Sequence, residues 1–433
     1  MDNPRRLALE SLIKSEESGV YSNLEINTVL SRAKLSKVDI SLYTALYLGV
    51  VEKKITLDYQ ILKYSKAKME ELDVQTKNAL RLGFYQLIYM DKIPDYSAVS
   101  ESVDLCKRRS KGFVNACLRS FIRDGKKIAL PDDKWEALSV KSSIPNEIIS
   151  IFRASYGDEI AEKIALASNP RAGINLRINS LKTDLKEIKG ILRARKIECE
   201  QIAITDEILI VKAPISEIAD LLEKGFAFVQ DPASFSCVKI LAPQKGEKVL
   251  DACSCPGGKS FSSAIEMKNE GQIISCDLHK NKLSLVQNGA LKLGLDIIKA
   301  EEQDAKAPRP DFVDAFDKVL CDVPCSGLGV IAKKPDIKYK SVEQIYNLPQ
   351  VQLSILKNCA NYVKVGGELV YSTCTLNAEE NENVVKSFLS QNDSFEPVDF
   401  ALESIKSTDG MYTFMPHIHE MDGFFVAKMK RVK

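Results

Sequence analysis

Hydrophobic residues in the first part of the chain recur at the spacing of an amphipathic helix. In the segments 7–13, 42–50 and 79–88, leucine, isoleucine and other apolar residues return every three or four positions. This spacing places them on one face of a helix. Proline is sparse and falls between these segments, as at Pro94, where it ends helices. The pattern predicts an all-helical domain over residues 1–129.

The hydrophobic period changes after residue 130. Short runs rich in β-branched residues, typical of strands, alternate with segments of helical spacing. The runs are 174–178, 202–205, 208–211 and 226–229, and the helical segments are 185–195 and 215–223. This order predicts a small α+β connecting subdomain over residues 130–236.

Strands and helices alternate from residue 237 to the end. Strands are predicted at 248–252, 272–276, 318–321 and 368–372, and helices at 259–268, 280–293, 342–363 and 379–389. The alternation is typical of a doubly wound parallel sheet, so we expect an α/β, Rossmann-like domain over residues 237–433. Such sheets bind ligands at the carboxyl ends of their strands. The polar residues at or just beyond these predicted ends are Asp251, Asp277, Asp304, Asp322 and Cys374.

Composition narrows the class of protein. The 433 residues are 45% hydrophobic and 27% charged, without an apolar stretch of membrane-spanning length or a signal peptide. We therefore expect a cytoplasmic protein without membrane association. Eleven cysteines at irregular spacing indicate reduced thiols rather than a disulfide framework. No Cys-x-x-Cys pair and only three histidines are present, so no metal site is expected.

Positive charge is concentrated in the first third of the chain. Residues 1–127 hold 22 Lys and Arg against 16 Asp and Glu, whereas the rest holds 38 against 43. A polyanion such as RNA would contact the basic part first, although a solvated helical surface explains the excess equally well. The densest basic cluster comprises Lys107, Arg108, Arg109, Lys111, Arg119 and Arg123.

A glycine-bearing loop follows the first strand of the predicted α/β domain. A phosphate-binding P-loop needs glycine where Cys253 stands, and a dinucleotide-binding loop needs glycines beyond the adjacent pair 257–258. S-adenosylmethionine has no phosphate and needs a close backbone approach at a helix amino end instead. The loop residues expected to bind it are Cys253, Ser254, Cys255, Pro256, Gly257, Gly258 and Lys259.

Two spaced aspartates support the same cofactor. Asp277 lies 19 residues after Gly258, at the end of the second strand, where an acidic side chain accepts hydrogen bonds from ribose hydroxyls. Asp304 ends the next strand-like run and is placed to contact adenine. A single aspartate is more often a turn or cap residue, but the order of loop, Asp277 and Asp304 favours S-adenosylmethionine.

Two cysteines fall at the ends of different strands. Cys325 lies in Asp-Val-Pro-Cys-Ser-Gly at 322–327, and Cys374 in Tyr-Ser-Thr-Cys-Thr at 371–375. A thiolate can add to C6 of a pyrimidine and so activate C5 for methylation, after which a second group must remove the C5 proton. Loops that methylate exocyclic amines carry an aromatic residue where Cys325 stands, so amine and protein-glutamine methylation are disfavoured. The common role of a free cysteine is that of a small buried hydrophobe, which we expect for Cys117, Cys199, Cys237, Cys276, Cys321 and Cys359.

Several motifs resemble known families. Segments 79–87, 93–103 and 112–119 resemble the NusB family of RNA-binding helical domains. Residues 170–171 and 176–183 resemble the connecting subdomain of RNA cytosine methyltransferases, in which Arg177 and Asn179 either contact RNA or are polar strand residues. A third resemblance is to the catalytic motifs of RNA 5-methylcytosine methyltransferases, and it covers segments 251–260, 322–337 and 371–383, with the closing segment 422–428. As a whole the chain resembles the RsmB/Sun/Fmu family of bacterial 16S rRNA (cytosine-5) methyltransferases.

The resemblance implies a role for each site residue. Cys374 would be the nucleophile, Cys325 would serve as or assist the base, and Asp322 would contact the cytosine ring as well as border the cofactor site. Lys259 would order the site. The implied partner is an unpaired or loop cytosine of 16S rRNA, modified by a monomeric enzyme.

Two other functions remain open at this point. DNA cytosine methyltransferases carry their nucleophile in a Pro-Cys dipeptide, like the one at 324–325. A non-catalytic ribosome-assembly or antitermination factor would use only the basic helical domain.

Overall fold

The computed structural model describes residues 2–168, 173–202 and 204–433, which form two compact units. The first unit comprises Met1–Asn169 and Lys333–Lys340, and the second comprises Pro170–Ala332 and Ser341–Lys433. Residues 170–171, part of the segment that resembles the connecting subdomain, lie outside the described residues.

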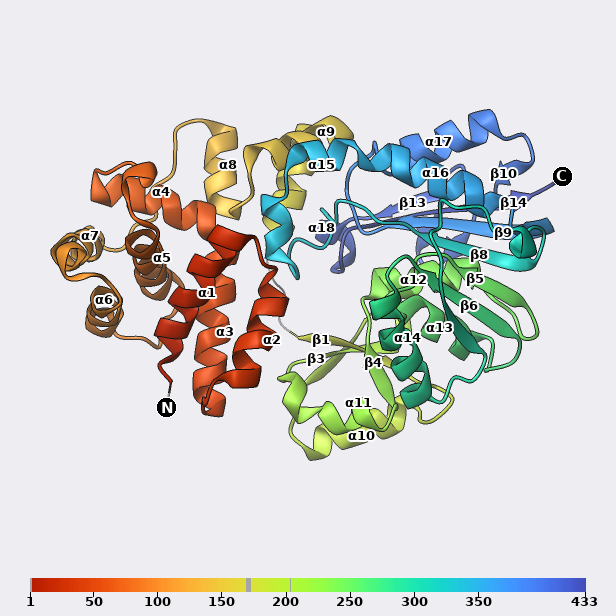
Figure 1. Ribbon diagram of the computed structural model, residues 1–433, viewed down its shortest axis with the longest axis horizontal. Helices are drawn as coiled ribbons and strands as arrows, with labels where there is room; N and C mark the ends of the chain where they lie inside the picture. The colour runs from red at the N-terminus through yellow and green to blue at the C-terminus, as the bar shows by residue number, and fades with distance from the viewer. Residues whose placement is uncertain (1, 169–172, 203) are drawn as a thin grey trace. The chain divides into compact units, whose positions relative to one another are not determined.

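The first unit is built from helices, as the sequence predicts (Figure 1). They are α1 (Pro4–Ser18), α2 (Ser22–Arg32), α3 (Lys37–Glu52), α4 (Lys54–Ser65), α5 (Val74–Tyr89), α6 (Asp95–Asp104), α7 (Lys111–Arg123), α8 (Lys134–Ser142) and α9 (Asn146–Ala167), with short 3-10 turns η1 (Met69–Glu71) and η2 (Arg108–Ser110). The apolar faces of α1 to α7 form one core, in which Leu46, Leu80 and Phe121 are fully buried. Asn3 and Asp73 cap the amino ends of α1 and α5 with their side chains.

Helices α8 and α9 belong to this first unit. The Thr56 hydroxyl donates to the Val140 carbonyl at 2.5 Å, and the Ile55 N–H donates to the Ser143 hydroxyl at 3.1 Å. These contacts tie α4 to α8. The compact unit therefore continues past residue 129, where the sequence predicts the first domain to end.

A segment from the second half of the sequence completes the first unit. It contains η5 (Pro335–Tyr339). The Lys338 ammonium donates to the Glu52 carbonyl at 3.0 Å, and the Tyr339 hydroxyl donates to the Val51 carbonyl at 2.9 Å. Lys338 is 2% exposed. The motif residues 333–337 thus pack on the helical unit rather than within the α/β unit.

The second unit begins with a small antiparallel sheet in the order β2-β3-β1-β4. Its elements are β1 (Ile174–Ile178), α10 (Leu185–Ala194), β2 (Cys199–Ile202), β3 (Thr205–Val211), η3 (Ile215–Glu217), α11 (Ala219–Glu223) and β4 (Ala227–Val229). The predicted strand 202–205 is wrong, because Ile202 ends β2 and Thr205 begins β3.

Arg177 and Asn179 are both fully buried, so neither alternative for them holds, contact with RNA or exposure on the surface of a strand. The Arg177 guanidinium lies over the Phe235 ring at 4.2 Å and donates to Glu266 at 3.2 Å. The Asn179 amide donates to the Leu293 carbonyl at 3.0 Å. Both side chains therefore make their polar contacts inside the unit, as expected because buried polar groups are usually hydrogen-bonded.

The large sheet has the strand order β10-β14-β9-β8-β5-β6-β7, with β13 paired to β14. Five strands are parallel: β5 (Lys248–Asp251), β6 (Gln272–Asp277), β7 (Ile298–Glu302), β8 (Phe316–Asp322) and β9 (Val363–Thr373). Three are antiparallel: β10 (Phe395–Pro397), β13 (Met411–Phe414) and β14 (Phe424–Arg431). The Rossmann-like core is confirmed, and its antiparallel edge is an addition to the predicted parallel sheet.

Helices cover both faces of this sheet (Figure 1). Helices α12 (Pro232–Leu241), α13 (Gly258–Glu266) and α14 (Lys280–Leu293) cover one face, and α16 (Leu348–Ala360) and α17 (Glu382–Gln391) cover the other. The unit also contains α15 (Val342–Tyr346), α18 (Pro416–His419), η4 (Pro310–Phe312) and a hairpin of β11 (Ala401–Leu402) and β12 (Ile405–Lys406). The predicted helix 342–363 is divided at Asn347, with a proline in the first turn of α16, a position that proline favours.

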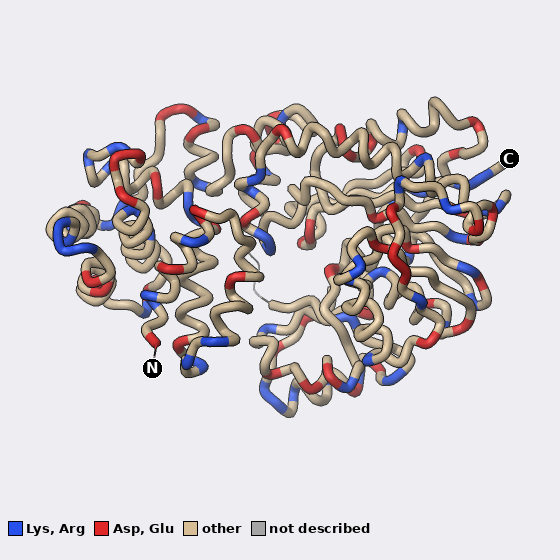
Figure 2. The backbone as a smooth tube through the Cα atoms, viewed as in Figure 1, with Lys and Arg blue, Asp and Glu red and all other residues tan. Residues whose placement is uncertain are grey.

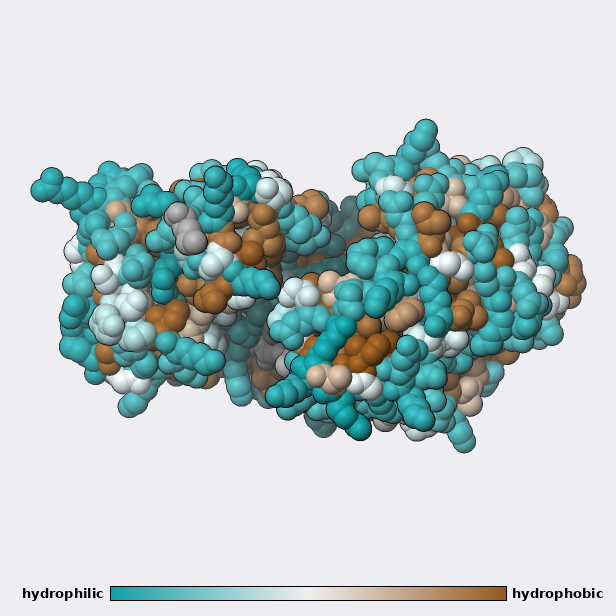
Figure 3. All heavy atoms as spheres, turned by 90° about the horizontal axis from the view of Figure 1, so that it is seen from below, coloured by the Kyte–Doolittle hydropathy of each residue, from teal (hydrophilic) through white to brown (hydrophobic). Residues whose placement is uncertain are grey.

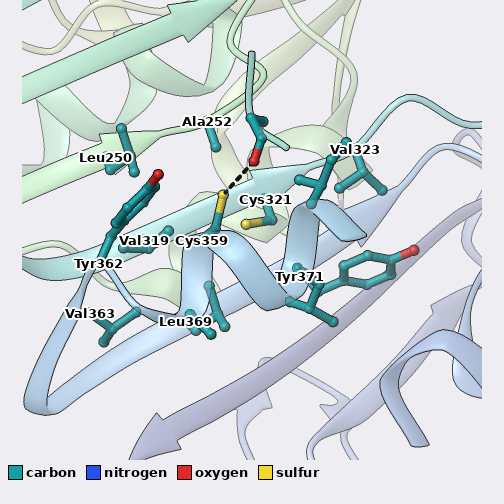
Figure 4. Close-up of a cluster of buried hydrophobic side chains, with 14 of the residues drawn as sticks. Leu250, Ala252, Val319, Cys321, Val323, Cys359, Tyr362, Val363, Leu369 and Tyr371 are labelled. Atoms are coloured by element: carbon teal, nitrogen blue, oxygen red, sulfur yellow. Dashed lines mark hydrogen bonds between the residues drawn. The ribbon is translucent and has the colours of Figure 1, made fainter. Parts of the chain in front are cut away.

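Apolar side chains of β5, β8, β9 and α16 form the core on one face of the sheet (Figure 4). Cys321 and Cys359 lie within this core, and the Cys359 thiol is 4.0 Å from the Ala305 carbonyl. Cys117, Cys237 and Cys276 are also buried, whereas Cys199 is partly exposed. Burial of these thiols fits the role of small hydrophobes.

The surface carries interspersed charges of both signs (Figure 2). The predicted basic cluster includes exposed Lys107, Arg108 and Arg109 at the start of the α6–α7 connection. On the face drawn in Figure 3, hydrophilic side chains cover most of the surface and apolar side chains gather in small patches. Among the described residues, none of the helices has the length and apolar character needed to cross a membrane.

Candidate active site

Loops from three neighbouring strands meet at one edge of the large sheet. Strands β5, β8 and β9 are adjacent and parallel, with Asp251 paired to Leu320 and Asp322 paired to Ser372. The chain leaves these strands through the loops that begin at residues 252, 323 and 374. Their carboxyl ends therefore bring the predicted site residues together, as expected for this fold.

The two predicted catalytic cysteines lie side by side. The Cys325 and Cys374 sulfurs are 3.3 Å apart, and both residues are partly exposed. A backbone hydrogen bond also joins the two loops, in which the Gly329 N–H donates to the Cys374 carbonyl at 3.0 Å. No room exists here for a side chain at residue 329, since a Cβ would lie 1.9 Å from the Gly423 carbonyl oxygen. Glycine is therefore required where these loops cross.

The Cys325 thiol is held in its protonated form. Its hydrogen bond with Cys374, followed by burial, raises the pKa of Cys325 well above its usual value. Two thiolates 3.3 Å apart would repel each other. The pair therefore ionises one sulfur at a time.

A buried ion pair connects the cofactor loop to the cysteine loops. The Lys259 ammonium donates to Asp322 at 2.6 Å, and the Ser372 hydroxyl donates to the other Asp322 oxygen at 2.8 Å. Burial is the largest single influence on Lys259 and lowers its pKa, but the charge and hydrogen bond of Asp322, together with the charges of Cys237 and Asp251, raise the pKa above its usual value. Asp322 is therefore an ionised acceptor, with 28% of its side chain exposed. The sequence predicted an ordering role for Lys259 without its partner.

The loop 252–258 makes a tight turn into α13. Gly257 has φ of 112°, a conformation that side chains disfavour, and its N–H donates to the Ser254 carbonyl at 2.7 Å. A Cβ on Gly257 would lie 2.5 Å from the Phe261 ring. The α13 amino end, with its unpaired N–H groups, follows at once.

Asp251 lies beneath this loop and is 2% exposed. One oxygen accepts from the Ser260 hydroxyl at 2.7 Å, while the other has no hydrogen-bond partner among the described residues. Burial raises the pKa of Asp251 to about 7. A buried polar atom without a partner is costly, and this oxygen is closed off from solvent, so Asp251 acts on the loop through Ser260.

The other predicted cofactor residues lie at the end of β6, after β7 or in the loop itself. Asp277, at the end of β6, accepts from the His279 N–H at 2.9 Å and from the Cys255 N–H at 3.4 Å. Asp304 follows β7, where its carboxylate accepts from the Lys306 N–H at 2.9 Å. The remaining predicted loop residues are Cys253, which packs partly buried against the core, Ser254, which is buried, and Pro256 and Gly258, which flank Gly257.

Sequence reasoning gave no role to four residues that shape the site: Asp251, Ser260, Ser372 and Glu380. Asp251 and Ser372 stand in motifs that were recognised, and their places at strand ends were the available signal. Ser260 and Glu380 also stand in recognised motifs. Ser260 pairs with Asp251, nine residues before it, whereas Ser326 and Gln352 lie 54 and 28 residues from Glu380, so no local pattern indicates the role of Glu380.

The residues present fit S-adenosylmethionine. Asp277 offers a carboxylate at the next strand end, and the space beside Gly258 is open to close approach, since a Cβ there would meet only the Gln230 amide at 3.6 Å. The donor set lacks the phosphate-binding glycines of nucleotide loops. These observations fit a ligand that carries hydroxyl and ammonium donors.

The sequence matches three family models. Residues 238–430 match "16S rRNA methyltransferase RsmB/F", residues 2–123 match the NusB family, and residues 144–217 match the ferredoxin-like domain of RsmF/B-like methyltransferases. A Bacillus subtilis protein named probable ribosomal RNA small subunit methyltransferase B is 38% identical over 99% of this chain and 98% of its own length. A Synechocystis protein of the same name is 33% identical over the full length of both chains. The chain belongs to the RsmB/F family of rRNA methyltransferases. As a member of this family it is an rRNA methyltransferase that uses S-adenosylmethionine.

Solved structures agree with the family fold. The crystal structure of PH0851 has a TM-score of 0.81 with this chain at 24% identity, and covers 100% of this chain and 99% of that one. NSun6 from Pyrococcus horikoshii, crystallised with SFG, has a TM-score of 0.59 at 22% identity over 67% of this chain and 98% of its own. At these identities the likeness extends to the fold alone.

Proposed function

We propose that this RsmB/F family member methylates C5 of a cytosine in 16S rRNA by covalent catalysis. Cys374 is the nucleophile and Cys325 is the base. The observation that best supports this is the 3.3 Å separation of their sulfurs. Addition at C6 and proton removal at C5 take place on neighbouring ring atoms, so the two groups must lie close together.

The Cys374 thiolate adds to C6 of cytosine and leaves an electron pair that activates C5. When bound, S-adenosylmethionine supplies the methyl group that C5 takes up. Cys325 then removes the C5 proton, the electrons of that C–H bond restore the C5–C6 double bond, and Cys374 leaves as a thiolate. The C5 proton replaces the proton that Cys325 gave to water before acting as the base, so both sulfurs end the cycle in their starting states.

The hydrogen bond between the sulfurs sets the order of these steps. While Cys374 carries the negative charge, Cys325 holds its proton, because the hydrogen bond with Cys374 is the largest cause of the raised Cys325 pKa. After the Cys374 sulfur has bonded to C6 it carries no charge. Cys325 can then release its proton to water and act as the base.

Asp322 orients the base of the substrate. Its pairing with Lys259 keeps the carboxylate ionised, so it accepts hydrogen bonds and does not donate them. The exocyclic amine of cytosine is the matching donor, and uracil lacks it. Asp322 therefore favours cytosine over uracil in this site.

The partner is an unpaired or loop cytosine, because a stacked base cannot reach thiols at a sheet edge. The basic cluster of the helical unit contacts RNA phosphates, and the enzyme acts as a monomer. Its rRNA substrate places it in the cytoplasm.

Labelled S-adenosylmethionine and unmodified 16S rRNA provide the test. We expect label in 5-methylcytosine at one position, mapped by nuclease digestion and mass spectrometry, and no label in duplex DNA of matched sequence. Label in an exocyclic amine, a ribose hydroxyl or the DNA would contradict the proposal.

A further inference from the structure

A buried carboxylate lies behind the two cysteines. Glu380, which is fully buried, stands between the end of β9 and the start of α17. One of its oxygens accepts from the Ser326 N–H at 2.8 Å and the Gln352 amide at 2.9 Å. The other accepts from the Ser326 hydroxyl at 2.5 Å and the Asn377 amide at 3.0 Å. Four donors on one carboxylate indicate the ionised form.

These donors belong to the flanks of both cysteines. Ser326 follows Cys325 directly, and Asn377 lies three residues after Cys374. Gln352, on α16, also donates to the carbonyl of Pro324, the residue before Cys325, at 3.0 Å. One side chain therefore holds both loops, although Ser326 and Glu380 are 54 residues apart in sequence.

We propose that Glu380 is a positioning residue that holds the Cys325 and Cys374 sulfurs in register and keeps their shared proton on Cys325. The inference deepens the proposed function and rests on it for its catalytic consequence. Glu380 does not touch substrate, since it is fully buried. It acts through Ser326, Asn377 and Gln352.

The charge of Glu380 supports the proposal that the shared proton stays on Cys325. The groups that act on Cys325 are Asp322 at the end of its own strand β8, Cys374 directly after the neighbouring strand β9, Glu380 from the loop behind, and the Tyr371 hydroxyl of β9, which donates to the Glu380 carbonyl. The Cys374 hydrogen bond and burial raise the Cys325 pKa most, and the charges of Cys374, Glu380 and Asp322 add to them. A negative charge at Glu380 therefore disfavours a thiolate at Cys325 and leaves Cys374 as the nucleophile.

The variant Glu380→Gln keeps the shape of the side chain but turns an acceptor into a donor that faces other donors. We expect its turnover number to fall about 100-fold, as for a misplacement of roughly 1 Å between reacting groups. The KM values for RNA and S-adenosylmethionine should stay within about twofold. The pH profile should also shift to lower pH, since Cys325 loses a neighbouring negative charge. The matched control is Glu379→Gln, at the exposed neighbouring position, which should behave as the wild type.

A second measurement needs no substrate. Diamide oxidises two nearby thiols to a disulfide, taking up their two hydrogens as its N=N bond is reduced to a hydrazine. In the wild type the Cys325–Cys374 disulfide should form readily, as read by peptide mass mapping. In Glu380→Gln it should form about tenfold more slowly. Because this readout does not depend on methylation, it tests the positioning role even if the proposed function fails.

Ser326→Ala provides a second test for the case in which Glu380→Gln does not fold. It removes one donor to Glu380 and should slow both cross-linking and turnover, but less than Glu380→Gln. If Glu380→Gln folds, adding Ser326→Ala to it should have little further effect. The inference is overturned if Glu380→Gln folds and shows wild-type cross-linking and turnover. If Glu380→Gln does not fold, wild-type cross-linking in Ser326→Ala overturns it. Absence of 5-methylcytosine in the wild-type reaction would instead refute the proposed function.

Discussion

Lys259 shows how one residue can order three loops. It stands in α13, next to the turn predicted to bind the cofactor, yet its ammonium reaches Asp322 at the end of β8. Asp322 is held in turn by Ser372 at the end of β9. A cation at this point therefore links the loop predicted to bind the cofactor to both cysteine-bearing strand ends, and pairs with the carboxylate that we propose contacts the substrate.

Removal of the Lys259 charge should lower the turnover number. In Lys259→Met, the partly buried Asp322 loses its ion-pair partner, and we expect the turnover number to fall about 100-fold, equivalent to ~3 kcal/mol. Steady-state kinetics on rRNA measure the change. Lys386→Met, at an exposed position of α17, is the matched control. Normal turnover in Lys259→Met would show that the ion pair between Lys259 and Asp322 is not needed for activity.

At the scale of elements, the turn between β5 and α13 depends on the backbone conformation of Gly257. Gly257→Ala combines a positive φ with a Cβ 2.5 Å from Phe261, whereas Gly246→Ala has a positive φ and open space around the Cβ. We expect each variant to lose about 1 kcal/mol of stability from the strained backbone. Only Gly257→Ala should also weaken S-adenosylmethionine binding, by at least about tenfold. Calorimetric titration measures the affinity, and equal affinities in the two variants would contradict the assigned role of the turn.

Most elements could be predicted from the hydrophobic period. The range 174–178 is strand β1, and the range 280–293 is helix α14, because one buried face fixes the spacing in each. Strand β14 was missed. Its apolar residues run continuously from Phe424 to Ala427, a pattern that periodicity cannot assign to one type of element.

The site could be predicted only where one local motif carries the chemistry. Cys325, Cys374 and the loop around Gly257 stand in such motifs. The partner of Lys259 lies 63 residues away, and Glu380 contacts Ser326 and Gln352, which lie 54 and 28 residues away. The fold brings these residues together, and no spacing in the sequence indicates it. The buried position of Arg177 was missed for the same reason, since its partner Glu266 lies 89 residues further along the chain.

At the scale of the whole molecule, the chain leaves the α/β unit after Ala332, contributes Lys333–Lys340 to the helical unit and returns. Lys338 is the most unusual residue of that segment, because burial lowers its pKa to about 8 from the usual 10.5. Between these two values the unfolded chain binds more protons at Lys338 than the folded chain does. Stability contributed at this position therefore rises as pH rises through that range.

This predicts a pH-dependent difference between the wild type and Lys338→Met. From pH 7 to pH 10 the wild type should gain about 2 kcal/mol of unfolding free energy relative to the variant. Urea unfolding of both proteins at each pH measures the difference, and the comparison cancels the contributions of the other titrating groups. A difference that is constant with pH would show that Lys338 is not buried as described.

The central claim is that Cys374 bonds to the substrate and Cys325 releases it. The most direct measurement incubates wild type, Cys325→Ala and Cys374→Ala with S-adenosylmethionine and unmodified rRNA, then separates the products under denaturing conditions. We predict a denaturation-resistant protein–RNA band in Cys325→Ala, with Cys374 identified as the attached residue, and neither band nor product in Cys374→Ala. A band in Cys374→Ala, attached through Cys325, would reverse the two roles and contradict the account.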